Sequence, residues 1–222
     1  MTNLLRIQID EKRVYGLDIL RALAILFVVI GHGGYLLPER ARKLINLLIF
    51  DGVSIFFVLS GFLIGGIFIK LIQEKGLNFK VLTNFWIRRW FRTLPNYFLI
   101  LIILFVLHYL FRDGFTFRSV NRYFFFSQNL FSEHPAEFFP EAWSLSIEEW
   151  FYLITPLVIG FFTLGKKISY KQGVMISAVF ILLLVTGFRF YRFNSLTVEG
   201  LGQWDVLFRK QVITRLDSLM YG

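Results

Sequence analysis

The feature that most constrains this chain is a series of five apolar runs, each about as long as a helix that crosses a lipid bilayer. A helix needs about 20 apolar residues to span the hydrocarbon core. The chain has 222 residues, is 56% hydrophobic and 19% aromatic, and has more apolar surface than a soluble domain of this size can bury. The sequence therefore predicts an all-α, polytopic transmembrane helix bundle. The five runs lie at 17–37, 51–72, 95–111, 143–164 and 173–191.

Charge indicates how these runs are oriented. The chain has 24 Lys and Arg against 15 Asp and Glu, and no cysteine, which excludes disulfides and a thiol nucleophile. Basic residues collect in the 70–92 and 165–172 connections, which the positive-inside bias places in the cytoplasm. We therefore expect a multi-pass protein of the plasma (inner) membrane with a cytoplasmic N-terminal segment, residues 1–14. The basic excess suits acidic lipid headgroups, and we expect no nucleic-acid partner and no bound metal. The expected outer segments are 38–50, 112–142 and 192–215.

Three ionisable residues, Asp18, Arg21 and His32, interrupt the first apolar run. An ionised side chain inside the membrane is costly unless it is paired or hydrated. At 100° per residue the three positions fall within about 60° of arc, so they share one helix face. Arg21 and His32 are separated by about 16 Å along the axis, so they would serve different depths of one cavity. The alternative is that Asp18 and Arg21 form only an i,i+3 pair near the cytoplasmic end.

The surroundings of His32 favour a site over a packing role. Gly31, Gly33 and Gly34 flank it and leave room for a ligand, and an imidazole titrates near neutrality, as a general base requires. Asp51 opens the second apolar run, where it either caps the helix or lies near His32 and orients the imidazole.

Two glycines of the second run, Gly61 and Gly65, are spaced four residues apart and predict a face for close helix packing.

A cluster of basic residues, Arg88, Arg89 and Arg92, precedes the third run, with Pro95 near the expected start of that span. Arg89 and Arg92 share one helical face, and guanidinium groups bind phosphates through paired hydrogen bonds. The cytoplasmic side is also where phosphorylated donors are found. The alternative, which the chemistry of the residues alone favours, is an ordinary positive-inside signal.

The fourth run contains two adjacent carboxylates, Glu148 and Glu149, which are hard to explain as packing in an apolar aromatic segment. Ser144 shares a face with Glu148, so we expect Glu148 to point into the bundle and Glu149 to lie 100° further round. Of the remaining histidines, His108 is expected in apolar packing and His134 in an exposed loop.

Taken together, these motifs resemble the acyltransferase 3 family of integral membrane acyltransferases. Each motif alone is a weak signal, but five in the family's order from residue 15 to the C-terminus are specific. The residues that carry the resemblance are Gly16, Asp18 and Arg21 through His32, Asp51 to Val53 with Ser60 to Phe62, Arg89 and Arg92 with Pro95, Trp143 to Leu145 with Glu148 and Tyr152, and Arg215 to Leu219.

The resemblance implies roughly ten transmembrane helices by analogy with the family. Residues 15–222 would then be a partial membrane acyltransferase domain, and the start of a sixth apolar run at Met220 indicates a fragment or a truncated product. It also implies a cytoplasmic acyl-CoA donor, such as acetyl-CoA, and an acceptor hydroxyl on an envelope or exported carbohydrate. No permanently bound cofactor is implied.

From the residues and the resemblance together we expect His32 to act as general base, with Asp51 or Glu148 orienting its imidazole and Arg21 stabilising negative charge. The rival interpretations are a transporter that moves acyl groups or glycans without chemistry, and a structural subunit held together by buried ion pairs. The candidate catalytic residues are His32, Arg21, Glu148 and Asp51, and the candidate donor-binding residues are Arg88, Arg89 and Arg92.

Overall fold

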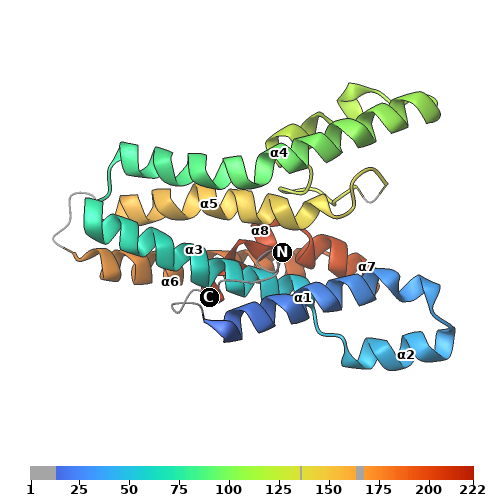
Figure 1. Cartoon of the computed structure of the whole chain (residues 1–222), viewed down its shortest axis with the longest axis horizontal. Helices are drawn as coiled ribbons and strands as arrows, with labels where there is room; N and C mark the ends of the chain where they lie inside the picture. Colours follow the sequence, from blue (N-terminus) through green and yellow to red (C-terminus); the bar gives the residue numbers. More distant parts are fainter. Residues whose placement is uncertain (1–13, 136, 164–167) are drawn as a thin grey trace, which may run out of the picture. The chain divides into compact units, whose positions relative to one another are not determined.

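The structure is a computed structural model that describes residues 14–135, 137–163 and 168–222. Within these ranges every regular element is helical (Figure 1). Five helices are long and apolar enough to cross a membrane, which confirms the predicted all-α bundle with five spans. The N-terminal segment, apart from Val14, and the predicted cytoplasmic residues Lys166 and Lys167 lie outside the described residues. The five helices are Tyr15–Leu36, Gly52–Lys75, Phe79–Phe111, Ala142–Thr163 and Tyr170–Ser195.

Short helical segments fill the connections between the long helices. The segments labelled η are 3-10 helices, except for η4, which is a π-helix. In chain order the elements are α1 (Tyr15–Gly33), η1 (Gly34–Leu36), α2 (Glu39–Leu48), α3 (Gly52–Lys75), α4 (Phe79–Phe111), η2 (Phe117–Ser119), η3 (Asn121–Phe125), α5 (Ala142–Thr163), α6 (Tyr170–Ser195), α7 (Leu201–Trp204), η4 (Asp205–Arg209), α8 (Val212–Arg215) and η5 (Leu216–Tyr221).

The chain forms two compact units, Met1–Leu59 and Ser60–Gly222, whose boundary falls within α3. In the first unit, α1 packs closely against the start of α3. A Cβ atom on Gly52 would lie only 2.5 Å from the carbonyl oxygen of Ala24, which is itself fully buried. Only glycine therefore allows this approach, which explains why a glycine follows Asp51 at the start of the helix.

The second unit is built around α5, which carries the largest number of buried residues and packs most extensively against α6. Figure 1 shows α4 running beside α5, and the Trp86 indole N–H donates to the Tyr152 carbonyl between them at 2.9 Å. A capping box opens α6, because the Ser169 side chain accepts from the Gln172 backbone and the Gln172 side chain accepts from the Ser169 backbone.

The third span begins much earlier than predicted. Instead of starting near Pro95, α4 begins at Phe79, where the Asn78 side chain caps it by accepting from the Val81 backbone at 2.9 Å. Hydropathy detects only the apolar second half, because the first half carries the arginines and is stabilised by contacts with α5. The helix continues through Pro95, as membrane helices tolerate where neighbouring groups satisfy the freed carbonyl.

The last described segment is anchored inside the second unit. Asp217 in η5 is fully buried and pairs with Arg189 of α6 at 2.5 Å. A Cβ atom on Gly61 would lie 1.8 Å from the Leu219 carbonyl oxygen, so α3 and η5 touch backbone to backbone. The predicted packing role is confirmed for Gly61. It is wrong for Gly65, where an added Cβ atom would meet nothing within 4 Å because this residue faces an apolar cavity of about 330 Å³.

The predicted outer segment, 112–142, folds against the second half of α4 around an aromatic core that includes Tyr97, Tyr123 and Phe138. His108 packs there as expected, with Nδ1 at 2.9 Å from the Leu104 carbonyl. The prediction for His134 is wrong, because its side chain is buried, with Nε2 at 3.2 Å from a backbone carbonyl. The compact folding of this segment around Tyr123 is what removes His134 from solvent.

Candidate functional site

Four side chains of the second unit converge between α3, α4 and α5, and we call them the Glu148 cluster: Ser60, Arg89, Glu148 and Tyr152. The Ser60 hydroxyl donates to Glu148 Oε1 at 3.3 Å. The Tyr152 hydroxyl accepts a hydrogen bond from Arg89 Nη2 at 2.7 Å and lies 3.3 Å from Glu148 Oε2. Each of the three helices therefore supplies at least one member of a single polar network.

The Glu148 cluster contains one positive and one negative charge in a largely apolar surrounding. Arg89 Nη2 lies 3.9 Å from Glu148 Oε2, and the two side chains are only 14% and 18% exposed. The guanidinium carbon also lies 4.4 Å from the centre of the Tyr152 ring. Placing either charge in such a surrounding without a partner is costly, so the pairing of Arg89 with Glu148 offsets part of that cost.

The cluster lies deep along the helices, well away from the α3–α4 turn. At the turn, the Leu77 backbone N–H donates to the Tyr170 hydroxyl at 3.3 Å, so α3, α4 and α6 have ends at the same level. Arg89 is ten residues into α4, or about 15 Å from that level at 1.5 Å per residue. This arginine was expected at a span boundary and instead lies inside a continuous helix.

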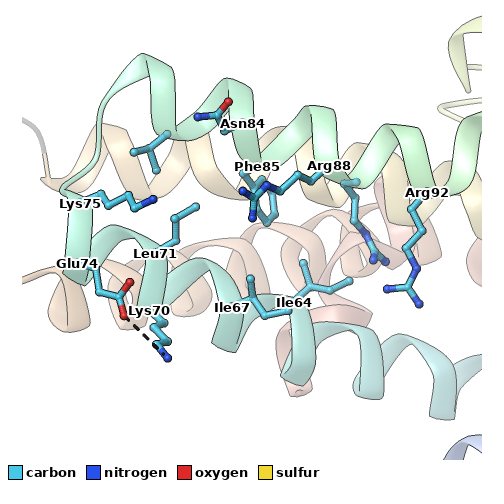
Figure 2. Close-up of a pocket in the computed structure, with 12 residues that line it drawn as sticks. Ile64, Ile67, Lys70, Leu71, Glu74, Lys75, Asn84, Phe85, Arg88 and Arg92 are labelled. Atoms are coloured by element: carbon cyan, nitrogen blue, oxygen red, sulfur yellow. Dashed lines mark ion pairs between the residues drawn. The ribbon is translucent and has the colours of Figure 1, made fainter.

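A pocket of about 430 Å³ lies between α3 and α4, and we call it the basic pocket (Figure 2). It brings together the three arginines, Arg88, Arg89 and Arg92, that the sequence singled out as donor-binding candidates. Its walls carry five basic side chains and one acidic side chain among apolar ones, and its inner end reaches the Glu148 cluster through Arg89. Its lining residues are Ile64, Ile67, Lys70, Leu71, Glu74, Lys75, Val81, Asn84, Phe85, Arg88, Arg89 and Arg92.

Both carboxylates of the fourth span point into the second unit, whereas only Glu148 was expected to do so. Glu149 is 5% exposed, and its Oε1 accepts a hydrogen bond from Thr93 at 3.0 Å. The prediction failed because α5 has neighbours on both sides, so a rotation of 100° moves a side chain from one buried contact to another. The hydroxyl of Ser144 donates to the backbone of Glu141 within its own helix turn.

The first unit carries the other predicted residues. Arg21 pairs with Asp18 at 3.5 Å, which is the i,i+3 pair considered as an alternative. His32 is exposed in the last turn of α1, and Cβ atoms added to Gly31 or Gly33 would meet nothing within 4 Å.

Asp51 caps α3 in the first unit. Its Oδ1 accepts from the Ser54 backbone at 3.3 Å and its Oδ2 accepts from the Ser54 hydroxyl at 2.6 Å. This geometry supports the capping interpretation of Asp51, and its expected role at the imidazole stays a prediction.

Sequence reasoning did not assign a role to Ser60, Tyr152 or Asp217. Tyr152 follows Glu148 by four residues, so helical spacing alone could have placed both on one face. Ser60 is 88 residues from its partner Glu148, and no local pattern reveals such a contact.

Comparisons with known proteins identify the family of this chain. The family model described as "Acyltransferase domain" matches residues 14–221. A Staphylococcus aureus (strain COL) protein with the provisional name O-acetyltransferase is 29% identical over 203 residues, which cover 83% of this chain and 31% of that protein. The O-acetyltransferase OatA of Staphylococcus aureus (strain NCTC 8325 / PS 47) is 30% identical over 191 residues, which cover 77% of this chain and 28% of OatA.

The chain thus spans less than a third of the length of these curated relatives. No solved structure gives a significant match. Because the family model covers nearly every residue from the first helix to the last, the chain belongs to the acyltransferase 3 family.

Proposed function

We propose that this chain is part of an O-acetyltransferase that moves an acetyl group from a cytoplasmic acyl-CoA to a hydroxyl group of an envelope or exported carbohydrate. Membership of the family and the O-acetyltransferase names of its relatives support the reaction class. The observation that carries the proposal is the basic pocket, because its inner end meets the partly buried Glu148 cluster.

The shape and charge of the basic pocket suit an acyl-CoA. This donor has an anionic phosphate-bearing head, a long neutral arm and a thioester at the far end. The pocket offers Arg88, Arg89 and Arg92 for negative charge and apolar side chains such as Ile64 and Ile67 for the arm. Glu148 and Tyr152 would hold Arg89 in one orientation, so that its free N–H groups can polarise the thioester carbonyl.

His32 is proposed as the general base of the reaction. It would take the proton from the acceptor hydroxyl as the oxygen attacks the thioester carbon. Collapse of the tetrahedral intermediate breaks the C–S bond, and the proton on His32 passes to the leaving thiolate. Arg21 is proposed to stabilise the negative charge that develops on the carbonyl oxygen, and Asp51 to orient the imidazole.

The membrane orientation is part of the same proposal. With the positive-inside bias, the α3–α4 turn and the N-terminus face the cytoplasm of a plasma (inner) membrane. The end of the basic pocket near the α3–α4 turn then opens towards the cytoplasm, which contains acyl-CoA. The segment 112–142 faces the opposite side of the membrane.

A transfer assay separates this function from its rivals. Purified protein would be supplied with labelled acetyl-CoA and a carbohydrate acceptor, with the His32→Ala variant alongside. We expect labelled carbohydrate from the unaltered protein, and none from His32→Ala although it still inserts into membranes.

The other outcomes would exclude His32 from the mechanism or support one of the rival functions. Substantial acetylation by His32→Ala would remove this residue from the mechanism. Movement of acetyl groups or glycans into liposomes without acetylated product would support a transporter. Loss of membrane assembly together with activity would support a structural role.

A further inference from the structure

The basic pocket extends beyond the three arginines that the proposed function uses. Its other end is lined by Lys70 and Lys75 of α3, near the α3–α4 turn. We propose that these two lysines form a subsite for the phosphate-bearing head of the acyl donor. This inference rests on the proposed function and divides the pocket into a head end and a thioester end.

The antiparallel course of α3 and α4 gives the pocket two distinct ends. Lys75 is the last residue of α3 and lies near the start of α4, whereas Ile64 is eleven residues earlier, about 16 Å along the helix. Figure 2 shows Lys70, Glu74 and Lys75 at the end near the turn and Arg92 at the opposite end. A ligand that fills the pocket therefore meets Lys70 and Lys75 at one end. At the other end it meets Arg89 and Arg92, beside the Glu148 cluster.

The charges at the head end suit an anion that arrives from water. The Lys70 and Glu74 side chains are 77% and 56% exposed, and they form a loose pair with 3.9 Å between Lys70 Nζ and Glu74 Oε1. An exposed pair of this kind is worth little, so Lys70 can exchange Glu74 for a phosphate at small cost. Glu74 is the one acid among the lining residues, which leaves a strong positive excess in the pocket.

The distance between the two ends favours the donor over a membrane lipid. A lipid headgroup would need only the exposed lysines, and its acyl chains would continue into the bilayer. An acyl-CoA carries its phosphates at one end and its reactive carbonyl at the other, joined by a neutral arm. The pocket has the same order of features, with lysines, then apolar side chains, then Arg89 beside Glu148.

A comparison of two donors tests the subsite. Transfer rates would be measured in lipid-free detergent with acetyl-CoA and with S-acetyl-N-acetylcysteamine, a thioester that lacks the phosphate-bearing head. In the Lys70→Gln, Lys75→Gln double variant we expect the KM for acetyl-CoA to rise roughly tenfold or more, because two charge-assisted contacts are lost. We expect the KM for the truncated thioester to be unchanged.

Two further variants sharpen the test. Lys80→Gln is the matched control, since Lys80 is exposed on the first turn of α4 and does not line the pocket; it should leave both KM values unchanged. Glu74→Gln should lower the KM for acetyl-CoA, because it removes the acid that competes with phosphate. Adenosine 3′,5′-bisphosphate, the head alone, should inhibit the unaltered protein and inhibit the double-lysine variant much less.

The contrary results are distinct from a failure of the proposed function. If the double-lysine variant changes both donors equally, or changes neither, the subsite is wrong. An effect that arises only in vesicles containing anionic lipid, and not in detergent, would assign the lysines to lipid headgroups and overturn the inference. If the unaltered protein transfers acetyl from neither donor, the proposed function itself fails.

Discussion

At the scale of single residues, the partnership of Arg89 and Glu148 explains why two charges can lie inside an apolar bundle. The Glu148 carboxylate pairs with the Arg89 guanidinium. The guanidinium also donates a hydrogen bond of 2.7 Å to the Tyr152 hydroxyl, which holds it in one orientation. The presence of a glutamate in this span could be read from the sequence as functional, because an ionised group there is costly without a partner. The identity of the partner could not be read, because Arg89 and Ser60 reach Glu148 only through the tertiary fold.

Paired substitutions at the two adjacent carboxylates test this partnership. Glu148→Gln keeps the volume of the side chain but removes the charge that balances Arg89, so we expect a large loss of transfer activity. Glu149→Gln should cost less, since Glu149 Oε1 accepts its hydrogen bond from the neutral Thr93 hydroxyl at 3.0 Å. Activity and membrane insertion would be measured side by side. Equal and near-normal activity of both variants would contradict the role given to the cluster.

At the scale of helices, the sequence predicted which segments span the membrane better than where they begin. Four of the five spans agree within a few residues, because length and hydropathy are properties of the segment alone. The start of α4 was missed because its first half carries Arg88, Arg89 and Arg92 and is held in place by contacts across the bundle. The burial of His134 was missed for the same reason, since loop composition does not reveal a tertiary core.

A matched pair of glycines in α3 tests the packing of this helix. Gly61→Ala should destabilise the protein, because its Cβ atom would lie 1.8 Å from the Leu219 carbonyl oxygen. Overpacking of this kind typically costs about 1–3 kcal/mol. Gly65→Ala makes the same chemical change into open space and should leave the melting temperature close to that of the unaltered protein. Equal melting temperatures for the two variants would mean that η5 does not contact α3 at Gly61.

The outer segment should respond to pH through His134. Burial lowers the pKa of the His134 imidazole below its ordinary value, and backbone hydrogen bonds only partly offset this. Below about pH 6.5 the unfolded segment therefore binds a proton more readily than the folded one, so folding stability is present at neutral pH and falls as the pH decreases. Hydrogen exchange of residues 117–139 would be compared at pH 7.5 and pH 5.5, after correction for the intrinsic exchange rate. Equal protection at both values would show that His134 titrates normally.

At the scale of the whole molecule, the two units carry different parts of the proposed reaction. The first unit, up to Leu59, holds Arg21, His32 and Asp51, and the second holds the basic pocket and the Glu148 cluster. The five candidate membrane spans follow from hydropathy, which acts along the chain, whereas the orientation and the roles of the candidate residues stay predictions. The pocket follows from the antiparallel packing of α3 and α4, and the sequence indicated only its arginines.

Binding of acetyl-CoA to the purified protein tests the central claim most directly, because it does not require a complete reaction. Titration calorimetry would compare the unaltered protein with the Arg89→Ala, Arg92→Ala double variant, with circular dichroism to verify that both are helical. We predict saturable binding by the unaltered protein and binding weakened at least about tenfold in the variant, while the apparent affinity for the carbohydrate acceptor changes less. An unchanged affinity for acetyl-CoA in a folded double variant would contradict the assignment of the basic pocket as the donor site.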